Sequence, residues 1–150
     1  IDRARRLRPI LVAADLGLSL HQWVTLASII QKESGRVEEM PLISAVFHNR
    51  LKKGMPLQAD PTVIYAIADF DGNLTRRHLN TPTPYNTYQN PGLPPGPIAN
   101  PGSDALNAAV RPAAVDYLFF VSRNDGTHVF STTLREHNQA VIQFQRRGRR

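Results

Sequence analysis

Seven of the chain's twelve prolines lie between residues 80 and 102, and no other feature of the sequence limits the fold as strongly. Proline lacks an amide hydrogen and fixes φ, so this stretch forms neither a long helix nor a central strand. So long an irregular stretch is either a functional loop or a disordered segment. Tyr85, Tyr88, Leu93 and Ile98 supply apolar anchors that a disordered linker would lack. We therefore expect residues 80–102 to form an ordered, functional loop.

The segments on either side of this loop carry helix signals. Ser19 and Gln22 have the spacing of a capping box, and Gly35 is expected to end the helix that they begin. Pro41 suits the first turn of a second helix, and Gly54 ends it. Caps and apolar periodicity predict helices at residues 1–18, 20–34, 39–53, 61–68, 103–110 and 134–146, with at most two turns at 75–79.

One segment has the character of two paired strands. Residues 117–121 and 128–130 are rich in aromatic and β-branched side chains, and the turn Asn124-Asp125-Gly126 lies between them. We expect an antiparallel β-hairpin here. The predicted fold class is therefore α+β, mostly helical, with a small antiparallel sheet and a long proline-rich loop.

Length and composition indicate one globular domain. A chain of 150 residues can bury a sizeable core, and we expect residues 1–150 to form a single domain. The absence of cysteine excludes disulfides, thiolate nucleophiles and thiolate metal sites. The chain has no initiator methionine, no signal peptide and no apolar run near the roughly 18 residues of a membrane span. We therefore expect a fragment of a longer protein, and the sequence leaves open an N-terminal membrane anchor ahead of it.

The net charge of +6 comes mainly from arginines near the two termini. These arginines are Arg3, Arg5, Arg6 and Arg8 at the start and Arg146, Arg147, Arg149 and Arg150 at the end. A basic balance permits an anionic polymer as partner. A nucleic-acid surface would interleave aromatic and basic side chains, and neither cluster contains an aromatic residue. We interpret the clusters as solvated charge and expect no nucleic-acid partner.

Glu33 is the first candidate for chemistry. The inward-facing positions of the helix at 20–34 are Trp23, Leu26, Ala27 and Ile30. Steps of three and four residues continue this face to Glu33, which puts a carboxylate on the buried side. Such a carboxylate either pairs with Arg36 or Arg50, or its pKa rises through loss of water, as a general acid requires. Periodicity alone leaves both interpretations open.

Two further segments suit a sugar ligand. Tyr85, Asn86, Thr87 and Tyr88 combine aromatic faces with amide and hydroxyl groups, although both tyrosines could instead pack on the core as a loop staple. Asp60 is explained as an N-cap ahead of Pro61, whereas Gln58 has no such explanation. The residues proposed as a glycan cleft are Gln58, Asp60, Tyr65, Tyr85, Asn86, Thr87 and Tyr88.

Other chemistries find little support. The histidines at positions 21, 48, 78, 128 and 137 show no metal-ligand spacing and are interpreted as surface or capping residues. Ser28 and Ser34 lack the glycines of a nucleophile elbow. The glycines form neither a P-loop nor a dinucleotide fingerprint. We expect no metal and no cofactor.

Eight segments in order along the chain resemble one known family, the endolytic murein transglycosylases, or YceG-like proteins. These segments are Leu26–Glu33, Ala45–Leu51, Met55–Tyr65, Thr83–Tyr88, Gly92–Ile98, Asn100–Gly102, Tyr117–Val121 and Glu136–Asn138. Together they cover roughly residues 20–145, and so many long motifs in register are highly specific.

The resemblance implies a lysozyme-like catalytic domain in which Glu33 is the catalytic residue and residues 80–102 are an active-site loop. Such a lytic transglycosylase cleaves the β-1,4 bond between MurNAc and GlcNAc in peptidoglycan and leaves 1,6-anhydroMurNAc ends. The expected location is the extracytoplasmic (periplasmic) face of the cytoplasmic membrane, with peptidoglycan synthases as further partners. Two alternatives stay open. One is a hydrolytic muramidase that uses Asp60 as a second carboxylate, and the other is a glycan-binding module without turnover.

Overall fold

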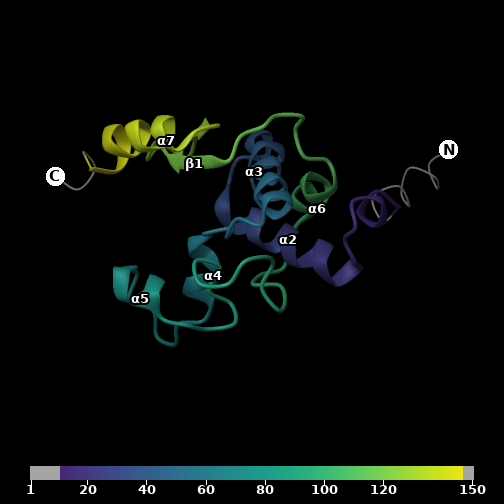
Figure 1. The fold of residues 1–150 in the computed structure, drawn as a ribbon. Coiled ribbons are helices and arrows are strands. Elements are labelled where there is room, and N and C mark those ends of the chain that lie inside the picture. Colours follow the sequence, from purple (N-terminus) through teal and green to yellow (C-terminus); the bar gives the residue numbers. More distant parts are fainter. Residues whose placement is uncertain (1–10, 147–150) are drawn as a thin grey trace.

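Helices make up most of the regular structure in a computed structural model that describes residues 11–146, with side chains to residue 144 (Figure 1). The helical elements are α2 (Leu20–Glu33), the 3-10 turn η1 (Val37–Glu39), α3 (Met40–Lys53), α4 (Asp60–Tyr65), α5 (Arg76–Asn80), α6 (Ser103–Val110), α7 (Leu134–Val141) and the π-helical turn η2 (Ile142–Arg146). The strands are β1 (Phe119–Ser122) and β2 (His128–Ser131). The α+β class is confirmed. Over residues 11–146 no helix combines the length and apolar character needed to cross a membrane.

α2 begins and ends on serine side chains. The Ser19 hydroxyl accepts the Gln22 amide hydrogen (3.1 Å) and the Gln22 side chain accepts that of Ser19 (2.9 Å), which confirms the capping box. The predicted Gly35 cap is wrong, because the helix already ends at Ser34, whose backbone is extended. Ser34 Oγ accepts the Arg36 amide hydrogen (3.0 Å), so a side chain closes this turn and no glycine is needed.

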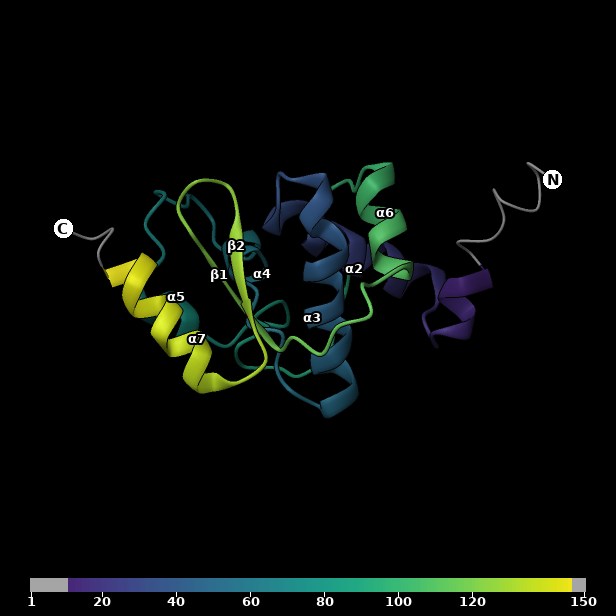
Figure 2. The same cartoon turned by 90° about the horizontal axis from the view of Figure 1, so that it is seen from above.

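Packing of α2 holds its last turn in place. The helix packs against α6 and, less extensively, against α3, and Figure 2 shows the three side by side. Leu26, Ile30 and Phe47 are fully buried in this core. Trp23 Nε1 donates a hydrogen bond to the Leu106 carbonyl (2.8 Å). Close packing from Trp23 to Ile30 therefore fixes the direction of the residue that ends the helix, Glu33.

The predicted hairpin is confirmed, although β1 begins at residue 119 and not at 117. β1 and β2 are antiparallel with Phe120 opposite Phe130. α7 packs against both strands and β1 contacts α3, so the hairpin lies between α7 and α3 (Figure 2). The Phe120 ring meets the Phe47 ring edge-on, with centroids 5.8 Å apart. This contact joins the sheet to the helical core.

Helix α4 is shorter than predicted and begins differently. It spans Asp60–Tyr65 instead of residues 61–68, and its N-cap is Ala59. The predicted capping role of Asp60 is therefore wrong. Its carboxylate instead accepts a hydrogen bond from the Tyr88 hydroxyl, 2.5 Å away. The Asp60 carboxylate is therefore not used to cap α4, and it can take part in a site formed by α4 and the proline-rich loop.

The two ends of the chain were predicted as single helices. The one predicted at 134–146 is α-helical only to Val141 and continues as the π-helical turn η2. Of the helix predicted within residues 1–18, residues 11–15 are helical, and the part before residue 11 lies outside the described residues. The side chains of both terminal arginine clusters lie outside them as well.

The proline-rich segment is held by buried polar side chains. Asn86 is fully buried; its amide donates to the carbonyls of Leu79 (3.0 Å) and Thr81 (2.8 Å) and accepts from the Tyr88 amide (2.9 Å). Thr87 is also buried, and its hydroxyl accepts the Ala59 amide hydrogen (2.9 Å). These side-chain hydrogen bonds satisfy backbone groups in a segment whose prolines prevent regular strand pairing. Asn86 and Thr87 are thus structural, which corrects their expected place in a sugar cleft.

Asn86→Ala should lower the free energy of unfolding by about 2–3 kcal/mol, because three backbone groups lose their bond to a buried side chain at once. Urea unfolding followed by circular dichroism measures this change. Asn107→Ala is the matched control, since Asn107 lies exposed on α6, and it should change stability by less than about 0.5 kcal/mol. Equal stability of the two variants would contradict the structural role of Asn86.

Candidate active site

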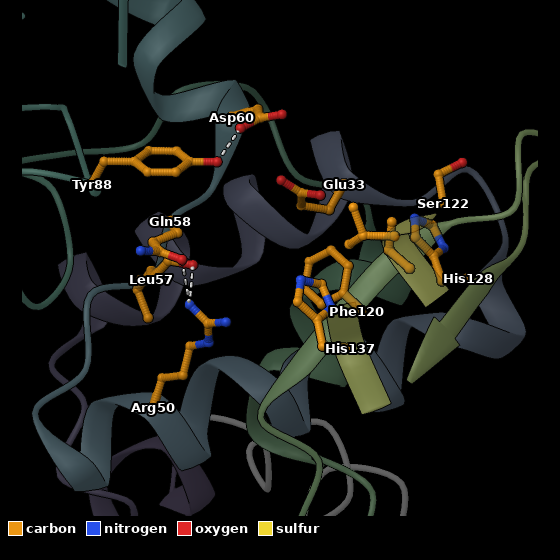
Figure 3. Close-up of a pocket in the computed structure, with 12 residues that line it drawn as sticks. Glu33, Arg50, Leu57, Gln58, Asp60, Tyr88, Phe120, Ser122, His128 and His137 are labelled. Carbon is orange, nitrogen blue, oxygen red and sulfur yellow. Dashed lines mark hydrogen bonds between the residues drawn. The ribbon is translucent and has the colours of Figure 1, made fainter. Parts of the chain in front are cut away.

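Glu33 lines a pocket of about 290 Å³ between the helical core and the hairpin (Figure 3). Its helical side is formed by Glu33, Arg50, Leu57, Gln58, Asp60 and Tyr88. Its other side is formed by Phe120, Val121, Ser122, His128, His137 and Val141. The pocket thus combines the end of α2 with four other parts of the chain: the last turn of α3, the segment that leads into α4, the proline-rich loop, and the hairpin with α7.

Glu33 is an acid without a cation beside it. Burial, and secondly the negative charge of Asp60, raises the pKa of its carboxyl from 4.5 to about 8. The salt bridges among the described side chains, residues 11–144, join Arg36 to Glu38 and His128 to Glu39, so neither includes Glu33. Of the two interpretations left open by the sequence, the raised pKa therefore holds. At pH 7 the carboxyl is mainly protonated and can donate a proton.

Asp60 and Tyr88 form a hydrogen-bonded pair beside Glu33. The Tyr88 hydroxyl donates to Asp60 Oδ1 at 2.5 Å (Figure 3). Burial, followed by the charge and hydrogen bond of Asp60, raises the pKa of Tyr88, so its phenol stays protonated. The bond holds the Asp60 carboxylate near the rim of the pocket, from where it acts on Glu33 through its charge.

The opposite wall is organised around two histidines. His128 Nδ1 lies 2.9 Å from Glu39 Oε1, and its amide donates to Glu39 Oε2 (3.1 Å), which ties β2 to η1. His137 on α7 stacks on Phe119, with ring centroids 4.9 Å apart. Burial, and secondly Arg50, lowers the pKa of His137, which favours its neutral form. No group of three metal-ligating side chains occurs among the residues described.

The structure places some of the proposed cleft residues in the pocket and others outside it. Gln58, Asp60 and Tyr88 join Glu33 in the pocket. Tyr65 and Tyr85 lie outside its lining and instead contact each other, with ring centroids 4.8 Å apart. The Tyr85 ring packs on the core, as the loop-staple interpretation predicts. About half of the surface of Tyr65 is exposed.

Sequence reasoning missed eight lining residues: Arg50, Leu57, Phe120, Val121, Ser122, His128, His137 and Val141. A signal existed for Arg50, because steps of four and three from Ile43 through Phe47 place it on the buried stripe of α3. The histidines carried no local signal, since long-range packing alone brings them to the pocket. The surface-or-capping interpretation was correct for His78, which caps α5, but not for these two or for buried His48.

Comparison with known proteins identifies close relatives. Residues 2–143 match the YceG-like family. The endolytic murein transglycosylase of Bacillus subtilis (strain 168) is 46% identical over 127 residues, which are 85% of this chain and 35% of that protein. Its namesake in Streptococcus pneumoniae (strain D39) is 32% identical over 132 residues, 84% and 24% of the two chains. A crystal structure of a yceG-like protein from Listeria monocytogenes has a TM-score of 0.80 at 41% identity, and the match covers 91% of this chain and 43% of that one. The chain thus spans about a third of the Bacillus relative.

Glu33→Gln should stabilise the protein increasingly as the pH rises. Below pH 4.5 both folded and unfolded Glu33 are protonated, but between 4.5 and 8 only the unfolded state ionises, which costs the wild type stability. Glutamine has no such penalty. Relative to pH 4, the variant should gain on the order of 3 kcal/mol over wild type by pH 7 in urea unfolding. A stability difference that stays constant between these two pH values would contradict the raised pKa.

Proposed function

This chain belongs to the YceG-like family, and we propose that it cleaves the β-1,4 bond between MurNAc and GlcNAc in peptidoglycan as a lytic transglycosylase. The observation that carries the proposal is Glu33, a pocket-lining acid with a pKa of about 8 that forms no salt bridge with any described side chain. The relatives named endolytic murein transglycosylase support the substrate and the reaction.

The reaction needs one group that gives a proton and then takes one. The Glu33 carboxyl protonates the glycosidic oxygen, the bond from that oxygen to C1 of MurNAc breaks, and GlcNAc leaves with a free 4-hydroxyl. The Glu33 carboxylate then removes the proton of the MurNAc C6 hydroxyl while O6 attacks C1. The 1,6-anhydro ring forms, Glu33 is protonated again, and no water is consumed.

Burial suits Glu33 to both steps. A pKa near 8 keeps the acid protonated at neutral pH, yet the carboxylate formed after donation is a stronger base than an ordinary glutamate. Asp60 contributes by its charge, which favours the protonated form of Glu33 before cleavage. The same charge stabilises the positive charge that develops at C1. The Tyr88 hydrogen bond orients Asp60 for both effects.

Hydrolysis of the same bond is the second candidate, and the position of Asp60 favours it. Asp60 and Glu33 share one pocket, as the two carboxylates of a glycosidase do. In that reaction Asp60 activates water or attacks C1. The products then end in a reducing sugar and not in an anhydro ring.

We place the reaction at the extracytoplasmic face of the cytoplasmic membrane, in a longer protein that contains this domain, with peptidoglycan synthases as partners. The support is the location of the proposed substrate and the share of the relatives that the chain spans. Protease accessibility of the full-length protein in spheroplasts tests the location, and protection from added protease would refute it.

Mass spectrometry of digested glycan strands should show anhydro ends, which are one water lighter than reducing ends. Glu33→Gln should lower the rate by at least about 100-fold, because general acid–base catalysis commonly contributes 10²–10⁴-fold. The variant should keep the wild-type fold by circular dichroism. Reducing ends would establish the hydrolase, and strands bound but uncleaved by the wild type would establish a binding module.

Asp60→Asn should keep the anhydro products and move the alkaline limb of the pH–rate profile to lower pH. The substitution removes the charge that adds to the effect of burial on the pKa of Glu33. The limb should remain above pH 4.5, because burial is the larger cause. If Asp60 is instead the second carboxylate of a hydrolase, the variant loses cleavage at every pH.

A further inference from the structure

Arg50 is a buried cation that has no carboxylate partner among the described side chains. Only 6% of the residue is exposed. Its Nε donates to the Leu118 carbonyl (2.7 Å), and Nη1 donates to the carbonyls of Pro56 (2.9 Å) and Leu57 (3.3 Å). Nη1 also lies 3.5 Å from Gln58 Oε1. Every one of these acceptors is neutral.

This arrangement is costly unless a further partner completes it. Taking an unpaired charge out of water costs several kcal/mol, so buried charges in proteins are normally paired. The Phe119 ring, whose centroid lies 5.1 Å from Arg50 Cζ, supplies a part of the missing interaction. It supplies no negative charge. The unfavourable free energy of burying this guanidinium therefore indicates a negatively charged partner outside the chain.

The unused end of Arg50 faces the pocket. Nη2 makes no hydrogen bond with the described residues, whereas Nη1 and Nε hold the group from the other side. In Figure 3 one terminal nitrogen meets the oxygens of Leu57 and Gln58, and the other is directed toward the side where Phe120 and His137 stand. Three anchoring carbonyls make this a preorganised donor whose side-chain entropy is already lost.

Arg50 and Glu33 occupy different parts of the pocket. Arg50 is the one lysine or arginine in the pocket lining of the described chain. In Figure 3, Leu57 and Gln58 stand between Arg50 and Asp60, and Glu33 is drawn on the Asp60 side of the pocket. Arg50 thus faces a part of the pocket beside the reaction centre, where a substituent of the sugar would lie.

We propose that Arg50 Nη2 binds a carboxylate carried by the muramyl residue and so sets the position of that sugar relative to Glu33. The inference rests on the proposed function. A guanidinium recognises carboxylates through directed, charge-assisted hydrogen bonds. Two parts of the substrate carry such a carboxylate. One is the lactyl group of a peptide-free strand, and the other is the stem peptide of a substituted strand.

Binding to the Glu33→Gln protein, whose turnover should be at least about 100-fold slower, tests the proposal by isothermal titration calorimetry. The probes are short peptide-free strands and peptide-bearing strands, each before and after conversion of their carboxylates to methylamides. Methylamide formation should weaken binding about 10–100-fold for the source that Arg50 reads. If conversion leaves the Kd of both kinds of strand unchanged, the proposal is wrong and Arg50 is structural.

A second substitution assigns the effect to Arg50. In the Glu33→Gln background, Arg50→Gln should bind intact and converted strands with nearly equal Kd. The control Arg36→Gln removes an exposed arginine outside the pocket and should retain the full difference. A full difference in folded Arg50→Gln would refute the assignment. If that variant unfolds, Arg50→Lys replaces it and should lose most of the difference, because lysine cannot reproduce the anchored fork.

The inference and the proposed function fail separately. Glu33-dependent anhydro products together with carboxylate-independent binding would refute only the role of Arg50. Carboxylate-dependent binding without any cleavage by the wild-type protein would refute only the transglycosylase.

Discussion

The burial of the Glu33 carboxyl at the end of α2 is the constraint on which the site depends. An ionised carboxylate in this position would need a cation to offset its loss of water, and no described side chain forms a salt bridge with it. Packing of α2 along α6 prevents the helix from turning this side chain outward. The pKa of about 8 is therefore a consequence of how the core is built.

Two ionisable residues on apolar helix faces line the pocket. Glu33 on α2 holds a proton at neutral pH, while Arg50 on α3 holds a fixed positive charge. Each occupies a position that periodicity assigns to the core, and each is costly for stability. Such a cost is typical of functional sites, where geometry for chemistry takes precedence over the most stable packing.

The helices, the hairpin and the inward-facing position of Glu33 could be predicted because their signals are local. The Ser19 capping box, the glycine after α3 and the apolar stripe leading to Glu33 all act within a few residues. What the sequence could not decide was the partner of each polar side chain. Asp60 reads as a helix cap but binds Tyr88 across 28 positions, and Asn86 reads as a sugar ligand but is fully buried. Both outcomes follow from the path of the proline-rich loop, which no periodic pattern specifies.

The central claim is that Glu33 is a protonated acid at neutral pH, and the ionisation of that one carboxyl tests it most directly. Carbon-13 NMR of protein labelled at glutamate side-chain carboxyls, with Glu33→Gln to assign the signal, follows it from pH 4 to 10. The account predicts a midpoint near 8. A midpoint near the ordinary value of 4.5 would contradict it, because Glu33 would then have no proton to donate at neutral pH.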